Sequence, residues 1–171
     1  MKKVLIVVDM QEDFVRGSLG SEAAQAIIPN VKNKINEYEN RGDAVVYTQD
    51  THGANYLDTN EGKHLPVKHC AFDTDGWRVV EELDNVERLH VLKETFGYTN
   101  WELFLDDDVE EIELVGVCTS ICVVSNALIL KAIYPEANIT VDASCCACVT
   151  PESHKHALET MKMCQINVIG E

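Results

Sequence analysis

The feature that most constrains the fold is an alternation along the chain between short apolar runs rich in β-branched residues and longer segments with helical periodicity. This pattern is typical of repeated strand–helix units, which form a parallel sheet covered by helices. The expected strands are Val4–Val8, Ala44–Thr48, Leu89–Lys93, Ile112–Gly116, Ile139–Val141 and Ile166–Ile169. The alternation therefore predicts an α/β fold.

Helix signals lie between these runs. Residues 27–38 carry apolar side chains at helical spacing, and Gly42 follows them as a stop. Residues 121–133 are apolar nearly all round, which predicts a buried helix. Residues 150 and 151 predict the start of a further helix, because threonine is a favoured N-cap and proline is favoured in the first turn.

The acidic balance of the chain restricts its partners. Its formal charge is −15 at pH 7, from 29 acidic and 14 basic residues, so we expect no nucleic-acid partner. No apolar stretch approaches the roughly 20 residues of a membrane helix, so we expect no membrane partner. Seven cysteines, an odd number without a secretory signal, indicate reduced thiols in a cytoplasmic protein. Since no repeat or linker is found, we expect one domain over residues 1–171.

Polar side chains follow several of the expected strands. In open parallel sheets, ligands bind outside the carboxyl ends of the strands, so a site is expected there. Asp9 follows the first strand, and Asp50 and His52 follow the second. Lys93 ends the third strand, and the fourth runs into residues 116–122. An acid, metal-type ligands, a lysine and a thiol thus converge on one edge of the sheet.

Cys122 is the strongest candidate nucleophile. A thiol near a helix N-terminus and beside a cation has a lowered pKa and exists more as thiolate. The backbone N–H groups from Cys118 to Cys122 offer an oxyanion site in the same turn. A plain buried cysteine is the alternative, and Cys118 competes for the role. For Asp9 the alternative interpretation is a helix cap, and for Lys93 it is the first solvated residue at the end of a strand.

The long segment from residue 51 to residue 75 has little periodicity, which is typical of functional or disordered loops. Asp50 and His52 are spaced so that both side chains point the same way in extended chain. With His69, and with Glu61 as a fourth ligand, they offer donors that suit Zn, Mn or Fe(II). A hydrated polar loop is the alternative.

The order of these residues resembles that of the isochorismatase-like cysteine hydrolases, and among them the nicotinamidase branch. The resemblance covers nearly the whole chain. The segments that carry it are Val7–Phe14, Thr48–His52 with Glu61 and Lys68–Cys70, Val91–Gly97, Gly116–Val123, and Asp142–Ser144 with Thr150–Leu158. Each segment alone is modest, but together and in this order they identify the family.

The resemblance implies a catalytic role for each matching residue. Asp9 corresponds to the acid and base, Lys93 to the catalytic lysine and Cys122 to the nucleophile. The backbone amides of Cys118 and Cys122 correspond to the oxyanion hole. The family usually has a cis peptide in this turn, which falls at Val117–Cys118.

The resemblance also implies a metal and a substrate. The positions of the metal ligands are Asp50, His52, Glu61 and His69. Zn is the expected metal, with Mn or Fe as alternatives. Phe14 and Phe96 lie in matching motifs and are expected to hold an aromatic ring, although core packing is an equal interpretation.

The fold and reaction that the resemblance implies are specific. The fold is a three-layer α/β/α sandwich with a six-stranded, mainly parallel sheet, and relatives are commonly homo-oligomers of two or more chains. The reaction is hydrolysis of nicotinamide to nicotinate and ammonia through a Cys122 thioester. Other small amides, N-carbamoyl compounds or ureido acids are alternative substrates.

Two further classes of function stay open. A binding or redox protein would keep the fold and use its thiols, and isochorismate cleavage is disfavoured because Cys122 occupies the nucleophile position. Cys145, Cys146 and Cys148 lie outside the family pattern. They are interpreted as small apolar packing or as a redox or metal site.

Overall fold

The computed structural model describes residues 2–171, and its centre is a six-stranded sheet in the order β3-β2-β1-β4-β5-β6. The strands are β1 (Lys3–Val8), β2 (Ala44–Asp50), β3 (Leu89–Lys93), β4 (Glu111–Val117), β5 (Asn138–Ala147) and β6 (Asn167–Ile169). All neighbouring strands pair in parallel. The α/β class and the six strands are confirmed, and the sheet of the described residues is wholly parallel where a mainly parallel one was expected.

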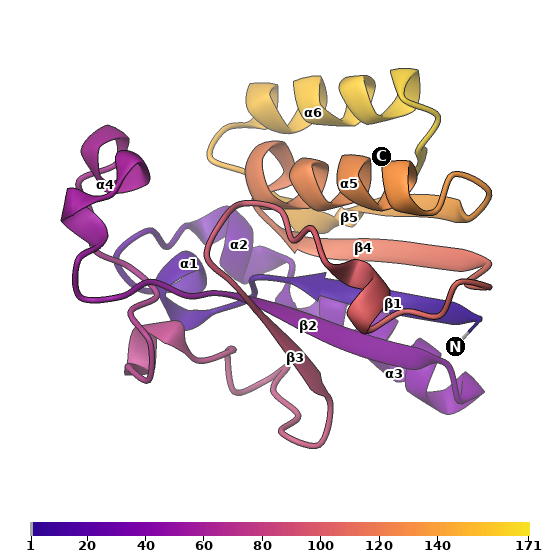
Figure 1. Ribbon diagram of the computed structural model, residues 1–171, viewed down its shortest axis with the longest axis horizontal. Coiled ribbons are helices and arrows are strands. Elements are labelled where there is room, and N and C mark those ends of the chain that lie inside the picture. The colour runs from indigo at the N-terminus through magenta and orange to yellow at the C-terminus, as the bar shows by residue number, and fades with distance from the viewer. Residues whose placement is uncertain (1) are drawn as a thin grey trace.

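Helices cover both faces of this sheet, so the expected three layers are present (Figure 1). The helices are α1 (Glu12–Val15), α2 (Glu22–Ala26), α3 (Ile28–Arg41), α4 (Asn60–His64), α5 (Val124–Ile133) and α6 (Pro151–Met163). Strand β1 divides two cores, because successive side chains of a strand point to opposite faces. Val4, Ile6 and Val8 pack with α5 and α6, whereas Leu5 and Val7 pack with α3.

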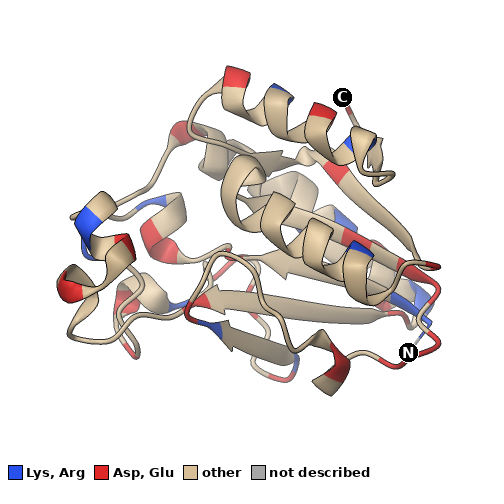
Figure 2. Ribbon diagram, turned by 45° about the horizontal axis from the view of Figure 1, so that its top comes forward, with Lys and Arg blue, Asp and Glu red and all other residues tan. Residues whose placement is uncertain are grey.

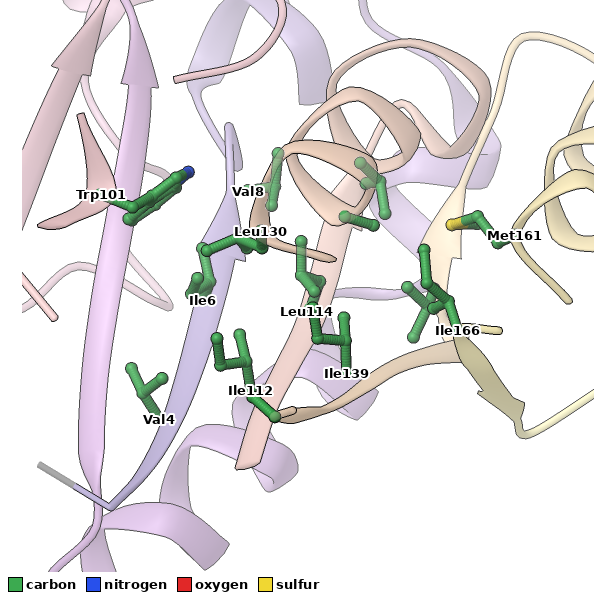
Figure 3. Packing of buried hydrophobic residues seen from close by; sticks show 14 of the residues in the cluster. Val4, Ile6, Val8, Trp101, Ile112, Leu114, Leu130, Ile139, Met161 and Ile166 are labelled. Carbon is green, nitrogen blue, oxygen red and sulfur yellow. The ribbon is translucent and has the colours of Figure 1, made fainter. Parts of the chain in front are cut away.

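The core under α5 is built from aliphatic side chains of neighbouring strands. Figure 3 shows Ile6 of β1 and Leu114 of β4 lying close to Leu130 of α5, with Trp101 beside them. These side chains are fully buried. Each contributes about 1.5–3 kcal/mol to folding. The apolar core can therefore support a polar site at the edge of the sheet.

The helix boundaries follow the sequence signals in two cases and depart from them in a third. Helix α3 ends before Gly42, which has a φ of +76°. Helix α6 begins after Thr150, whose side chain accepts a hydrogen bond from the N–H of Ser153 over 3.1 Å. The segment expected as one helix from residue 121 instead opens with a π-helical turn at Thr119–Val123, and α5 begins at Val124.

Strand β5 is the element that the sequence pattern predicts least well. It was expected over Ile139–Val141 but extends over Asn138–Ala147. Asp142 and Ser144 interrupt the apolar run, so the sequence pattern predicted only the first part of the strand. Lys34 of α3 lies 2.9 Å from the Asp142 carboxylate, so a polar side chain is tolerated there. The residues that follow, up to Ala147, are small and buried.

The segment from residue 51 to residue 75 is more ordered than a plain loop. It contains a 3-10 turn at Tyr56–Asp58 and helix α4. An isolated parallel bridge joins His52 to Ala71, so β2 is continued for a short distance beyond its end. This bridge returns the far end of the segment to the edge of the sheet.

The register of the sheet brings the carboxyl ends of four strands together. Asp50 at the end of β2 pairs with Lys93 at the end of β3. Val8 of β1 pairs with Thr48 on one side and with Gly116 on the other. The residues that follow these pairs therefore share one edge.

The charged residues are distributed around this framework. Most of the length of the strands is uncharged, and acidic and basic residues lie mainly on helices and loops (Figure 2). Among residues 2–171, none of the helices combines the length and apolar character that crossing a bilayer requires.

Candidate active site

The three side chains expected to catalyse the reaction meet at the carboxyl edge of the sheet. Lys93, the last residue of β3, lies between Asp9 and Cys122. Its Nζ is 2.6 Å from Asp9 Oδ2 and 3.7 Å from Cys122 Sγ. All three side chains are buried. The edge therefore presents an acid, an amine and a thiol, with the amine in the middle.

Asp9 is held in one orientation by the end of β2. Thr48 Oγ1 donates a hydrogen bond to Asp9 Oδ1 over 2.6 Å, and the Asp9 N–H donates to the Thr48 carbonyl over 3.2 Å. Asp9 has a φ of +49°, a left-handed conformation that aspartate adopts more readily than most residues. With Oδ1 fixed by Thr48, Oδ2 faces Lys93.

Lys93 keeps its positive charge although it is buried. Burial alone would lower the pKa of its ammonium group, but the surrounding acidic groups, Asp9 first, outweigh burial and raise it. The Nζ also lies 3.4 Å from Asp50 Oδ1 and donates to the Thr95 carbonyl over 3.2 Å. The fixed cation that the sequence indicated is thus present at this position.

The acidity expected for Cys122 is wrong. Burial and the charge of Asp9 raise the pKa of the Cys122 thiol well above its usual range, and the opposing effect of Lys93 is smaller than either. The physical reason is that the side chain is only 5% exposed. Burial also raises the pKa of Asp9, which makes its carboxylate a better proton acceptor. The thiol is therefore protonated at rest and must lose its proton as it attacks.

The turn that carries Cys122 has the expected backbone feature. The Val117–Cys118 peptide is cis. The Cys118 carbonyl accepts hydrogen bonds from the N–H groups of Ile121 and Val123, over 3.0 and 3.1 Å, and this closes the π-helical turn. Cys118 and Cys122 both line the same cavity. The use of their backbone amides as an oxyanion hole stays a prediction.

Asn126 supports the nucleophile and was not found from the sequence. Its Nδ2 donates to the Cys122 carbonyl over 2.8 Å and to the Phe96 carbonyl over 3.2 Å. Its Oδ1 accepts from the Tyr98 N–H over 2.9 Å. The side chain is fully buried, so these hydrogen bonds fix the segment after β3 to the start of α5. A polar residue inside an apolar helix was the available signal.

Four further side chains form a group beside the catalytic residues. Each offers one ligand atom, and these atoms lie within 4.8 Å of one another; the residues are Asp50, His52, Glu61 and His69. His52 Nε2 is 2.9 Å from Asp50 Oδ2, and His69 Nε2 is 3.5 Å from the same oxygen. Glu61 Oε1 lies 3.6 and 3.7 Å from the two Nε2 atoms. All four residues expected as ligands are thus brought together.

The hydrogen bonds around this group leave its donor atoms facing inward. The Nδ1 of His69 contacts the Val67 carbonyl over 2.8 Å, which sets Nε2 toward the other ligand atoms. Gln11 accepts from the Asp50 N–H over 2.7 Å and donates to the Asp50 carbonyl over 2.9 Å. Burial opposes ionisation of Asp50, but the contacts of its carboxylate with His52 and His69 lower its pKa below the usual range.

A divalent metal fits these residues. Glu61 Oε1 is buried, yet no hydrogen bond reaches it from any described residue. A buried carboxylate oxygen without a donor is costly unless a cation is bound. Two imidazoles and two carboxylates are donors that Zn, Mn and Fe(II) accept. His64, the remaining histidine of this segment, is exposed, and its Nδ1 contacts the Asn60 carbonyl.

One cavity borders both Cys122 and three of the four candidate ligands. It measures about 430 Å³ and is lined by Phe14, Leu19, Gly20, Asp50, Glu61, Leu65, His69, Phe96, Cys118, Ile121, Cys122 and Val149. The Phe14 ring lies 5.4 Å from the His69 ring, and Phe96 is 44% exposed. Both phenylalanines expected to hold a substrate therefore face this cavity. A larger open hollow of about 570 Å³ beside β3 contains neither the catalytic nor the ligand residues.

Comparison with known proteins decides the family. Residues 3–170 match the family model described as isochorismatase domain. The chain belongs to the isochorismatase family. It is 30% identical over 173 residues to an uncharacterized isochorismatase family protein, PncA, of Bacillus subtilis (strain 168), and the match covers 92% of this chain and 93% of that one. The family resemblance inferred from the motifs is therefore confirmed.

Solved structures of this family share the fold. The pyrazinamidase of Pyrococcus horikoshii in complex with zinc is 26% identical, covers 100% of both chains and has a TM-score of 0.87. The nicotinamidase/pyrazinamidase PncA of Bacillus subtilis is also 26% identical, over 99% of this chain and 100% of that one, with a TM-score of 0.87. These similarities agree with the expectation of a hydrolase that acts on amide C–N bonds.

Proposed function

We propose that this isochorismatase-family protein is a metal-containing cysteine amidohydrolase that converts nicotinamide to nicotinate and ammonia. The observation that carries the proposal is one cavity bordered by Cys122 and by three of the four candidate ligands, Asp50, Glu61 and His69. The Asp9–Lys93–Cys122 group supplies a nucleophile, a base and a cation. The four-ligand group beside it supplies a place for a metal ion at the same cavity.

The first chemical step is attack by Cys122. Asp9 Oδ2 takes the thiol proton, and the raised pKa of the Asp9 carboxyl favours this transfer. Lys93, 3.7 Å from the sulfur, stabilises the thiolate that forms. The sulfur then bonds to the amide carbon, and the backbone amides of Cys118 and Cys122 hold the oxyanion.

The second half of the reaction returns the enzyme to its starting state. Asp9 gives its proton to the nitrogen, the C–N bond breaks, ammonia leaves and a thioester remains on Cys122. Asp9 then takes a proton from a water molecule, whose oxygen attacks the thioester carbon. The C–S bond breaks, the sulfur regains a proton from Asp9, and the carboxylic acid is released.

The remaining residues orient the substrate. Asp50, His52, Glu61 and His69 would hold the metal, which supplies a Lewis acid for the ring nitrogen of nicotinamide; Zn is proposed, with Mn or Fe as alternatives. Phe14 and Phe96 would contact the faces of the ring. Leu19, Leu65 and Val149 add apolar lining to the cavity.

Ammonia release from nicotinamide tests the proposal. The metal-loaded enzyme should produce ammonia and nicotinate, and Cys122→Ala should abolish turnover. If Cys122→Ala keeps activity within about tenfold, a barrier change of ~1.4 kcal/mol, the covalent route is refuted. Cys164→Ser, at an exposed cysteine, is the matched control and should be fully active.

A panel of small amides, N-carbamoyl compounds and ureido acids distinguishes the substrates. Nicotinamide should be preferred and chelator should suppress its hydrolysis. Preference for an N-carbamoyl compound by the metal-free enzyme would overturn the nicotinamide assignment while keeping the cysteine mechanism. The homo-oligomeric state and the cytoplasmic location stay predictions.

A further inference from the structure

Two thiols outside the catalytic group lie side by side at the carboxyl edge of the sheet. Val117 of β4 and Ala147 of β5 are partners in parallel register. Cys118 and Cys148 are the next residues along these two strands. Neighbouring strands are about 4.8 Å apart. A disulfide needs Cα atoms roughly 4.4–6.8 Å apart, and the spacing of the two strands that lead into these cysteines falls within that range.

The surroundings of Cys148 favour its thiolate. Its Sγ is 2.9 Å from Ser120 Oγ and 3.2 Å from Ser153 Oγ. It lies just before α6, where the N-terminal end of the helix favours negative charge. Burial raises the pKa of Cys148, but the hydrogen bonds with the two serines outweigh burial and lower it. A hydroxyl that donates to sulfur stabilises the charged form.

Cys118 has the opposite character. Burial first, and then the neighbouring Cys148, raise the pKa of Cys118 to about 12. Cys118 therefore stays protonated when Cys148 ionises. Ser120, two residues after Cys118 in the same turn, has its Oγ 2.9 Å from the Cys148 sulfur, so Cys148 packs against the turn that contains Cys118.

Each cysteine of the pair borders a hollow, although Cys148 is only 6% exposed. Cys118 lines the catalytic cavity. Cys148 lines a separate hollow of about 320 Å³ together with Ile27, Thr150 and His154. Two neighbouring thiols that each border a cavity, one of them with a lowered pKa, are an arrangement that a small oxidant can convert to a disulfide.

We propose that Cys118 and Cys148 form a redox-active dithiol that hydrogen peroxide oxidises to a disulfide. The Cys148 sulfur attacks one peroxide oxygen, the O–O bond breaks, and the released hydroxide takes a proton to become water. Cys148 is then a sulfenic acid. The Cys118 sulfur attacks the Cys148 sulfur, the S–O bond breaks, and the Cys118 proton leaves with the hydroxide as a second water.

The other cysteines of the described chain are placed differently. Cys145 and Cys146 are consecutive in β5, so their side chains pack into opposite cores, as the small apolar interpretation predicts. Cys70 is fully buried, and burial raises the pKa of its thiol. Cys164 is exposed and caps the C-terminal end of α6. Cys148 alone of the clustered cysteines thus has a redox interpretation.

The disulfide would connect the nucleophile turn to the end of β5. Any effect of the disulfide on catalysis rests on the proposed function, because Cys118 lies in the turn that carries Cys122. The formation of the disulfide is independent of the proposed function. The test therefore reads the covalent bond itself and uses Cys122→Ala protein, in which the nucleophile cannot be oxidised.

The folded Cys122→Ala protein is treated with hydrogen peroxide, quenched with an alkylating agent and digested for mass spectrometry. The expected product is a cross-linked pair of peptides containing Cys118 and Cys148, which dithiothreitol separates. Adding Cys164→Ser should leave the yield unchanged, and adding Cys148→Ser should abolish the cross-link. Adding Ser120→Ala should slow its formation, since the thiolate loses a hydrogen-bond donor.

Two results overturn the proposal. One is oxidation of Cys148 to sulfinic acid with Cys118 still free for alkylation. The other is a cross-link that appears only after the protein is unfolded in urea. Both can be read whether or not the enzyme hydrolyses nicotinamide, so failure of the dithiol and failure of the proposed function are distinguishable.

Discussion

Replacing Lys93 by methionine removes the cation that separates the acid from the thiol, and this should cost more stability than any surface ion pair. Lys93 and Asp9 have fully buried side chains, with Nζ and Oδ2 only 2.6 Å apart. Methionine fills a similar volume but leaves the Asp9 carboxylate buried without a counter-charge. Breaking one partner of a buried pair costs about 3–5 kcal/mol.

The loss can be measured by urea unfolding of metal-free protein. With a slope of about 2 kcal/mol per molar urea, the midpoint of Lys93→Met should fall by about 1.5–2.5 M. The matched control is Lys3→Met. Lys3 lies 2.8 Å from Glu111 on the surface, with side chains 42% and 46% exposed. That substitution should leave the urea midpoint almost unchanged, because an exposed ion pair contributes little to stability.

A double mutant separates the ion pair from general packing. Asp9→Asn removes the carboxylate, so Lys93→Met combined with Asp9→Asn should be less destabilised than the sum of the two single variants. If Lys93→Met costs no more than Lys3→Met, or if the two single effects add without coupling, the buried pair does not have the role assigned to it.

Other contacts give further measurable outcomes. His69→Ala should remove the bound divalent metal in elemental analysis, whereas His64→Ala, at an exposed position, should retain it. Asn126→Ala should lower the free energy of unfolding by about 1–3 kcal/mol, because the buried backbone groups of Phe96, Tyr98 and Cys122 lose their hydrogen-bond partner. It should also lower kcat for nicotinamide. Burial opposes ionisation of Asp142, but contacts with Ser144 and Lys34 lower its pKa. That stabilisation is complete above the ordinary carboxyl pKa and is lost as pH falls through the lower folded value, so the gap in urea midpoint between wild type and Asp142→Asn should close below about pH 4.

The placement of the site could be predicted because parallel strands end at one edge. Asp9, Asp50 and Lys93 each terminate or follow a strand, and the register of β1, β2 and β3 makes them neighbours. The family motifs added Glu61, which comes from a short helix that no strand end indicates. Topology and motif together thus predicted which residues meet.

Features that depend on burial and on partners could not be predicted in the same way. The strand order predicts that Cys122 lies near the cation of Lys93, but it does not predict that desolvation of Cys122 outweighs the effect of that cation on its pKa. Thr48 was expected at the end of a strand and in a family motif, but its role in orienting Asp9 through its hydroxyl was not predicted. Strand β5 was cut short at Asp142 because the charge that pairs with it comes from α3.

Lys93 has a consequence that reaches across the whole edge of the sheet, because one ammonium is shared between Asp9 and Asp50. It lies 2.6 Å from the first carboxylate and 3.4 Å from the second. The candidate catalytic residues and the proposed metal ligands therefore share the same positive charge. Binding or removal of a metal ion at Asp50 changes how strongly the Asp50 carboxylate attracts the Lys93 ammonium. The electrostatic potential at the Cys122 sulfur changes with it. Chelation should thus alter the reactivity of Cys122 toward alkylating agents even when no substrate is present.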